Sequence, residues 1–421
     1  MDKAWVISVN MGYGHQRTAF PLKDLAVNNK IINANDYPGI PGRDRRIWEA
    51  SRRFYEFISR LQNIPLVGNF FFSLYDRFQK IFSFYPKRDL TRASFGLKQI
   101  YSLLKGGWGK HLIIKLITQN SQLKTDFPII TTFFTPAFMA EFFNYPGEIF
   151  CIICDADISR TWAPLIPRQS KIKYFAPTER VAERLELYGV RKENIFLTGY
   201  PLPEFSEDDL RQRILNLDPR KKYFNKYRAL IEKTLGQLPE SAGRPLTIMF
   251  AVGGAGAQKE IGVRIVKSLA VKIWAGDIKV ILVAGIREKI KKYFERNLEK
   301  LKLKNHQNIE IIFEKDTESY FQKFNLAFKK TDILWTKPSE LSFYAVLGIP
   351  IIIAPPVGSQ EKFNKRWLLK SGFGLEQENP RYVKQWLFDW LNQGYLAEAA
   401  MQGFIEGEKM GTFNIEKIAL K

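Results

Sequence analysis

The sequence contains few cysteines and histidines and no long apolar run. Among 421 residues there are two cysteines, Cys151 and Cys154, and three histidines. Two cysteines exclude a disulfide framework. Their spacing suits a metal pair. Because there is no second pair and both cysteines lie in an apolar stretch, we expect buried structural thiols and no metal.

No apolar run reaches the roughly 18 residues of a transmembrane helix, and Trp5–Val9 follows the first residue too closely for a signal peptide. The sequence predicts a cytoplasmic protein, soluble or bound to a membrane surface.

Acidic residues are also scarce relative to basic ones. The chain has 64 Lys and Arg against 43 Asp and Glu, a formal net charge of +21. Such an excess favours an anionic neighbour, either a membrane surface or another polyanion. We expect no nucleic-acid partner, because no recognisable nucleic-acid motif accompanies the charge. The hydrophobic fraction of 45% excludes a disordered chain.

Short apolar runs alternate with polar, helix-prone stretches. Continuous apolar runs of four to seven residues are typical of strands buried on both faces of a parallel sheet, and strand–helix alternation predicts a doubly wound α/β fold. The predicted strands are Trp5–Val9, Phe127–Phe134, Ile149–Cys154, Tyr174–Ala176, Leu246–Val252, Val280–Ala284, Ile309–Phe313, Ile333–Trp335 and Pro350–Ala354.

The alternation breaks once. The stretch between Phe205 and Arg244 is charged and helix-prone, and the chain is too long for one ordinary core. We therefore predict a first domain at 1–205, a charged helical linker or insertion at 206–243, and a second domain at 244–421.

Two glycine-rich loops follow predicted strands. In VNMGYGH, Gly12, Gly14 and His15 follow the first strand, at the sheet edge where doubly wound folds bind ligands. An imidazole there can accept a proton from a hydroxyl, although a plain turn with a surface histidine explains the motif equally well. In GGAGAQ, Gly253, Gly254 and Gly256 can cradle a phosphate or form a tight turn. The loop lacks the Lys-Ser/Thr ending of an ATPase P-loop.

A third cluster of polar residues occupies TKPSELSFYAVLGIPIIIAPPVGSQEKFN. Lys337 follows a predicted strand and can meet a phosphate. Ser339 can cap a helix at Glu340–Leu347, and Glu361 and Asn364, after the next strand, can bond sugar hydroxyls. Each residue alone is typical of a solvated loop, but together they gather at one sheet edge.

Five blocks in this order resemble the two-domain glycosyltransferases of the GT-B type, nearest to bacterial diacylglycerol glucosyltransferases and plant monogalactosyl-diacylglycerol synthases and more distantly to the peptidoglycan GlcNAc-transferase. The segments 40–125 and 205–244 show no such likeness. The blocks are NMGYGHQRTA at 10–19, CDADISRTW at 154–162, YFAPTERVAERLELYGVRKENIFLTGYPL at 174–202, FAVGGAGAQK at 250–259, and TKPSEL, GIP and SQEKFN between 336 and 364.

The resemblance implies two Rossmann-like domains with a cleft between them and metal-free transfer of a sugar from a nucleotide sugar, usually UDP-linked. It implies no cofactor beyond this co-substrate. The acceptor would bind the first domain and the donor the second. His15 and Asp155 match the family's catalytic positions, Asp155 as candidate general base. The matching substrate-binding positions are Gly12, Gly14, Trp162, Gly253, Gly254, Gly256, Lys337, Ser339, Glu340, Gln360, Glu361 and Asn364.

Two of these blocks depart from the family pattern. In the first domain, Ser159 replaces a histidine between Asp155 and Trp162. The donor-side turn of the second domain also differs. The turn after Lys337 is two residues shorter, and Phe343 replaces a helix glutamate. Glu340 lies one turn earlier, where a carboxylate would repel a diphosphate. The sequence therefore keeps a second hypothesis open, a non-catalytic nucleotide-binding protein, and a third, an enzyme similar to UDP-GlcNAc 2-epimerases.

Residues 43–115 combine 15 Lys and Arg with five acidic residues. Basic residues with large aromatic ones favour an element lying on an anionic membrane leaflet, while a core-packed helical insertion is the alternative. We expect a hexosyltransferase that acts on a lipid acceptor at the inner face of the membrane. The interleaved aromatics are Phe54, Tyr55, Phe57, Phe70, Phe71, Phe72, Tyr75, Phe78, Phe82, Phe84 and Tyr85.

Overall fold

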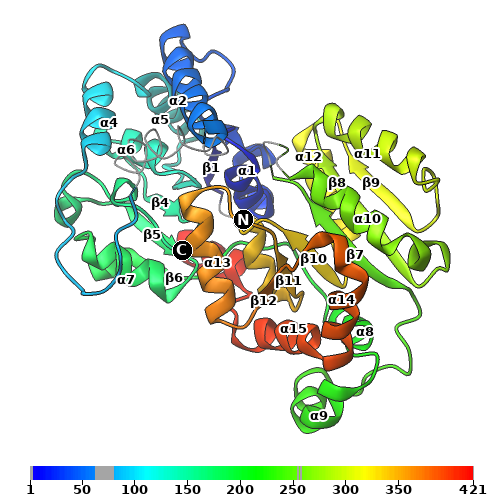
Figure 1. The fold of residues 1–421 in the computed structure, drawn as a ribbon. Coiled ribbons are helices and arrows are strands. Elements are labelled where there is room, and N and C mark those ends of the chain that lie inside the picture. The colour runs from blue at the N-terminus through cyan, green and yellow to red at the C-terminus, as the bar shows by residue number, and fades with distance from the viewer. Residues whose placement is uncertain (1–2, 62–79, 254–255, 257, 421) are drawn as a thin grey trace. The chain divides into compact units, whose positions relative to one another are not determined.

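The computed structural model describes residues 3–61, 80–253, 256 and 258–420, and the chain divides into two compact units (Figure 1). Unit 1 contains Met1–Leu202, Val357–Phe363 and Met410–Lys421, and unit 2 contains Pro203–Pro356 and Asn364–Lys409. Each unit is built on its own six-stranded parallel sheet. The predicted pair of doubly wound α/β domains is confirmed.

The sheet of unit 1 has the order β2-β1-β3-β4-β5-β6. Alternate residues of its first strand enter different apolar clusters: Trp5 and Ile7 belong to one, and Ala4 and Val6 to the other. A strand that is apolar on both faces must be covered on both faces, which explains the continuous apolar runs. The strands are β1 (Trp5–Ser8), β2 (Ile32–Asn33), β3 (Ile129–Thr131), β4 (Ile149–Ile152), β5 (Lys173–Ala176) and β6 (Ile195–Leu197).

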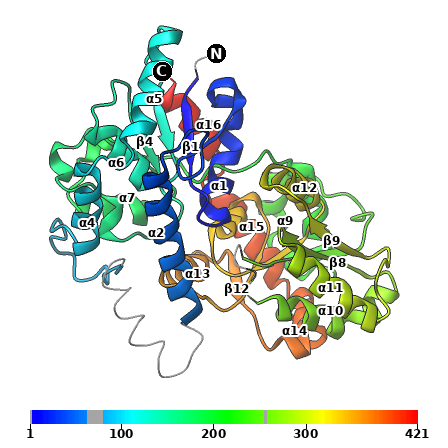
Figure 2. The same cartoon turned by 90° about the horizontal axis from the view of Figure 1, so that it is seen from above.

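Helices cover both faces of this sheet (Figure 2). They are α1 (Tyr13–Ala19), α2 (Gly42–Leu61), α4 (Phe95–Lys105), α5 (Lys110–Leu123), α6 (Phe134–Phe142), α7 (Glu179–Leu187) and α16 (Gly411–Ala419). Five short 3-10 helices complete the described part of the unit: η1 (Phe20–Leu25), η2 (Val27–Asn29), η3 (Arg160–Trp162), η4 (Pro167–Gln169) and η5 (Lys192–Asn194).

The sheet of unit 2 has the order β12-β11-β10-β7-β8-β9. Its strands are β7 (Leu246–Ala251), β8 (Ile278–Gly285), β9 (Ile309–Phe313), β10 (Ile333–Thr336), β11 (Ile351–Ile353) and β12 (Gly374–Glu376). Its helices are α8 (Glu207–Leu217), α9 (Lys222–Leu235), α10 (Lys259–Trp274), α11 (Glu288–Lys300), α12 (Thr317–Lys329), η6 (Glu340–Leu347), α13 (Ser359–Lys370), η7 (Pro380–Tyr382), α14 (Val383–Gln393) and α15 (Tyr395–Glu406), with the first turn of α13 grouped with unit 1.

Two segments group differently from the predicted domain boundaries. The predicted linker 206–243 forms α8 and α9 of unit 2, where the buried Arg213 donates hydrogen bonds to the carbonyls of Thr331, Leu347 and Gly348. The last helix, α16, belongs to unit 1, although the sequence assigned all of 244–421 to the second domain. Ile415 and Ala419 are buried in the apolar cluster on the face of the first sheet that also carries Val6, Ile130 and Phe150.

The predicted insertion 43–115 is partly core-packed. Trp48, Leu97, Leu104 and Trp108 are buried in the main core of unit 1. Phe84 is buried as well, whereas Phe82 and Tyr85 are exposed. The remaining aromatic side chains named above, from Phe54 to Phe78, lie outside the described residues.

Candidate functional site

His15 lies where the strand order of the first sheet reverses. Chain connections run outward from β1 to β2 on one side and to β3 on the other, so the β1–β3 boundary is the switch point. His15 is in α1 directly after β1, and Thr132 follows β3. Open α/β sheets bind ligands beside such a point, at the carboxyl ends of the strands. The structure therefore places His15 where the sequence predicted a binding edge.

Thr132 holds His15 through two hydrogen bonds. His15 Nδ1 lies 2.8 Å from the Thr132 carbonyl oxygen, and Thr132 Oγ1 donates to the His15 carbonyl at 3.0 Å. Because a carbonyl only accepts, Nδ1 carries the hydrogen and the lone pair of the neutral ring is on Nε2. The Phe133 ring packs edge-on against the imidazole at 4.8 Å, and Trp162 lies 6.3 Å away. Burial lowers the pKa of His15 to about 4, outweighing the hydrogen bond to Thr132, so the ring is neutral near pH 7 and can accept a hydrogen bond.

Gly12 shapes the turn that leads into α1. Its φ of 115° and ψ of 177° form the N-cap of the helix, a backbone conformation that is essentially restricted to glycine. Gly14 lies one residue before His15, inside the first turn. Gly12 thus acts through the backbone, by turning the chain abruptly from β1 into the helix that carries His15, while the Gly14 carbonyl accepts a hydrogen bond from Thr18.

The loop after β4 carries the second predicted catalytic residue. Asp155 is half-buried there. Asp157, two residues on, is buried and receives two 2.8 Å hydrogen bonds from the buried Arg184, which identifies it as a structural carboxylate. Ser159 bonds Thr161 through their hydroxyls. Trp162 is buried, and its carbonyl accepts a hydrogen bond from Tyr174.

The second sheet has an equivalent switch point between β7 and β10. Gly253 follows β7 and Lys337 follows β10, and the two strands are paired in register from Ile248 with Ile333 to Ala251 with Thr336. A Cβ on Gly253 would lie 2.2 Å from Lys337 Cε, so the lysine side chain crosses directly over this glycine. Gly256 closes the turn by donating its N–H to the Gly253 carbonyl at 2.7 Å. Gly254 lies outside the described residues.

The segment after Lys337 differs from the expected capped helix. Residues Glu340–Leu347 form a 3-10 helix, and the Ser339 side chain makes no capping hydrogen bond. The predicted capping role of the Ser339 side chain is therefore wrong. The Ser339 carbonyl accepts the N–H of Ser342, the first hydrogen bond of the 3-10 helix. Glu340 is half-buried. Phe343 is 1% exposed and its ring packs on Trp367 at 5.0 Å, so a core contact replaces the family's glutamate.

The last block divides between the two units. Gln360 and Glu361 group with unit 1 and Asn364 with unit 2. The Glu361 carboxylate accepts the N–H of Val357 at 2.6 Å and so caps the turn before α13. Asn364 is fully buried and donates to the Pro338 carbonyl at 3.2 Å. Asn364 therefore braces the turn that follows Lys337.

Sequence reasoning missed Thr132, Thr18 and Tyr200. Thr132 acts on His15 largely through its backbone carbonyl, which no side-chain pattern reveals. Thr18 Oγ1 lies 2.7 Å from Tyr200 Oη and 3.3 Å from Cys154 Sγ. Thr18 is 136 positions from Cys154 and 182 from Tyr200, so only the fold brings them together.

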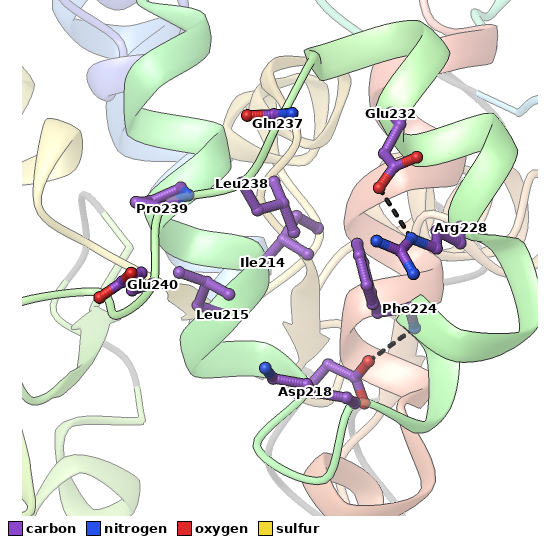
Figure 3. Close-up of a pocket in the computed structure, with 11 residues that line it drawn as sticks. Ile214, Leu215, Asp218, Phe224, Arg228, Glu232, Gln237, Leu238, Pro239 and Glu240 are labelled. Carbon is purple, nitrogen blue, oxygen red and sulfur yellow. Dashed lines mark hydrogen bonds and ion pairs between the residues drawn. The ribbon is translucent and has the colours of Figure 1, made fainter.

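The cavity drawn in Figure 3 lies elsewhere in unit 2. It has a volume of about 290 Å³ and lies between α8, α9 and the segment Gln237–Glu240. None of the predicted site residues lines it. Three of its charged groups have partners: Asp218 accepts the N–H groups of Lys222 and Phe224, and Arg228 pairs with Glu232 at 2.8 Å. We therefore assign the candidate site to the two switch points. Within the described residues, no group of three acidic, His or Cys side chains could hold a metal, and no helix has the length and apolarity to span a membrane.

The comparisons with solved structures show the fold of the chain. The MurG of Acinetobacter baumannii superposes with a TM-score of 0.51 at 14% identity, covering 99% of each chain. That likeness shows the fold: the chain has the GT-B fold that the sequence resemblance implied. A UDP-GlcNAc 2-epimerase of Neisseria meningitidis superposes with a TM-score of 0.44 at 13% identity, covering 84% of this chain and 88% of that one.

By sequence, the chain is similar to the processive diacylglycerol beta-glucosyltransferases. It is 23% identical over 257 residues to that of Bacillus subtilis, covering 59% of this chain and 56% of the relative, and 22% identical over 288 residues to that of Bacillus pumilus, covering 67% and 64%. The chain thus spans less than two thirds of these relatives. A family described as a domain of unknown function (DUF6938) also matches, at residues 239–323 and 288–416.

Proposed function

We propose that this protein is a glycosyltransferase that moves a hexose from a nucleotide sugar, most simply a UDP-sugar, to a membrane lipid. The observation that carries the proposal is the neutral His15 ring, held by Thr132 with its Nε2 lone pair at the switch point of the first sheet. The sequence similarity to diacylglycerol beta-glucosyltransferases and the GT-B fold support it.

The chemistry requires a base on the acceptor side. As the bond between the sugar and the diphosphate breaks, the acceptor hydroxyl must lose its proton to form the new glycosidic bond. His15 and Asp155 are the candidates in unit 1, with His15 accepting a hydrogen bond from the hydroxyl through Nε2. In unit 2, Lys337 and the backbone of the loop that contains Gly253 and Gly256 would hold the leaving diphosphate.

A basic, aromatic surface on unit 1 supports the membrane part of the proposal. Phe82, Tyr85 and Phe95 are exposed by 37%, 66% and 61%. Lys80 Nζ and the Arg88 guanidinium lie 5.5 and 5.7 Å from the Phe82 ring centroid. Exposed rings among basic residues suit an anionic leaflet, which would place the protein peripherally on the cytoplasmic face of the membrane. We expect Tyr85→Ser/Phe95→Ser to reduce cosedimentation with anionic lipid vesicles, and binding equal to wild type would remove this surface from the proposal.

Two assays test the activity. Calorimetric titration with UDP, GDP, ADP and TDP identifies the nucleotide, and the matching nucleotide sugars are then incubated with diacylglycerol vesicles. We expect selective nucleotide binding and a glycolipid product that His15→Gln and Asp155→Asn reduce strongly. A nucleotide sugar that is epimerised without lipid would instead favour the epimerase hypothesis.

One observation favours a second candidate, a protein that binds a nucleotide without transferring a sugar. Phe343 occupies the family's glutamate position and is buried against Trp367, so it cannot bond a ribose hydroxyl. Saturable nucleotide binding with no turnover on any lipid tested would support this candidate over the transferase.

A further inference from the structure

His15 is confined by a buried hydrogen-bond network on the side of its ring that faces the sheet. Cys154 Sγ lies 3.4 Å from His15 Nδ1 and 3.2 Å from the Thr132 carbonyl oxygen that also accepts Nδ1–H. Thr18 Oγ1 reaches both Cys154 Sγ at 3.3 Å and the Gly14 carbonyl at 2.8 Å. Thr18, one turn further along α1, and Cys154, after β4, thus both contact the turn that carries His15.

Tyr200 is the member of this network that lies farthest from His15 along the hydrogen bonds. Its hydroxyl lies 2.7 Å from Thr18 Oγ1, and both residues are buried. The Thr18 hydroxyl has one hydrogen, and its close acceptors are the Gly14 carbonyl and Cys154 Sγ. A Tyr200 hydroxyl that donates to Thr18 leaves the single Thr18 hydrogen for the Gly14 carbonyl or Cys154 Sγ, so the Thr18–Tyr200 hydrogen bond couples Tyr200 to the turn that carries His15.

The C-terminal helix holds Tyr200 in place. Gly411 packs so closely that a Cβ there would lie 2.1 Å from the Tyr200 carbonyl oxygen. Thr412 Oγ1 donates to the Leu202 carbonyl at 2.8 Å, and Asn414 Nδ2 donates to the Thr198 carbonyl at 3.0 Å. Figure 2 shows α16 beside α1 and β1. The first turn of α16 thus clamps the backbone on both sides of Tyr200.

We propose that Tyr200 is a positioning residue for His15, acting through Thr18 and Cys154 and held by α16, and that it keeps His15 Nδ1 against the Thr132 carbonyl, the contact that fixes the Nδ1–H form with Nε2 as acceptor. This inference rests on the proposed function in one respect: that function has Nε2 accept a hydrogen bond from the acceptor hydroxyl. The first turn of α16 thereby supports the His15 site, although in sequence it follows all of unit 2.

The test reads the tautomer directly in the full-length protein. The chain has three histidines, so ¹⁵N-histidine labelling gives three imidazole signals, and His111→Gln and His306→Gln assign the third to His15. We expect the Nδ1–H tautomer in wild type, and mixed tautomers in Tyr200→Phe and Thr18→Val. Thr18→Ser keeps the hydroxyl and should show the same His15 signal as wild type. Tyr145→Phe is the matched control, since Tyr145 is another buried tyrosine of unit 1, and it bonds Asn120 and the Phe127 carbonyl instead.

Activity provides the second readout. Loss of one hydrogen bond in the network should lower kcat about two- to tenfold with little change in KM, and Asn414→Ala should act in the same direction. A His15 signal that is unchanged in Tyr200→Phe, or equally changed in Tyr145→Phe, would overturn the proposal. If wild type transfers no sugar, the proposed function fails, while the tautomer shift still decides the positioning role.

Discussion

The side chain of Lys337 crosses over the backbone of Gly253, so close that a methyl group on Gly253 would lie 2.2 Å from Lys337 Cε. The two residues are 84 positions apart, but each directly follows one of the two strands at the switch point of the second sheet. A glycine at this position lets a cation lie against the backbone at the start of the loop, where it suits an anionic ligand such as a diphosphate.

Gly253→Ala tests this contact. The added methyl group must displace the flexible end of Lys337, so we expect a small change in the free energy of unfolding and weaker nucleotide binding, by about tenfold. Calorimetric titration with UDP measures the affinity, and urea unfolding measures the stability. Gly42→Ala is the control, because a Cβ there meets nothing within 4 Å. Unchanged affinity in Gly253→Ala would show that the position of Lys337 does not matter for the nucleotide.

Lys337→Met tests the charge separately from the contact. Methionine keeps most of the aliphatic stem and removes the ammonium group, so we expect UDP affinity to fall by about tenfold, with a weaker dependence on salt. Lys272→Met is a suitable control, because Lys272 pairs with Asp277 on the surface of unit 2. Equal affinities for UDP and for uridine in the wild type would contradict a diphosphate contact.

The lowered pKa of His15 predicts a pH-dependent stability. An unfolded histidine binds a proton below about pH 6.5, whereas the folded ring stays neutral until about pH 4. Folding stability therefore falls as pH falls from 6.5 to 4, by about 3 kcal/mol at most. Urea unfolding of wild type and His15→Gln at several pH values isolates this contribution. Identical pH slopes for the two proteins would contradict the lowered pKa.

The Asp157–Arg184 pair predicts a strong structural effect beside the site. Arg184 is fully buried and also donates to the Phe82 carbonyl at 2.9 Å. Arg184→Met leaves the Asp157 carboxylate buried without its partner, which should cost about 3–5 kcal/mol of unfolding free energy. The double variant Asp157→Asn/Arg184→Met should recover part of the loss, and a fully additive double variant would show that the pair is not coupled.

Several features of this protein follow from the sequence alone. The apolar runs are long enough to be strands and too continuous to be half-exposed, so the residues by themselves predict parallel sheets covered on both faces. Glycines, His15 and Lys337 directly after strands predicted ligand-binding edges, because parallel strands end at one edge of a sheet. The short edge strands β2, β6 and β12 were missed because two or three residues carry no periodicity.

Other features were decided by tertiary structure. The tautomer and pKa of His15 depend on the Thr132 carbonyl and on burial, neither of which a side-chain pattern contains. Phe343 becomes a core residue only because Trp367 packs against it. The helix α16 joins unit 1 because Ile415 and Ala419 find their apolar partners there and not beside their sequence neighbours. Local sequence thus determined which strands form and where they end, while contacts between distant segments determined the chemical state of the side chains at those ends.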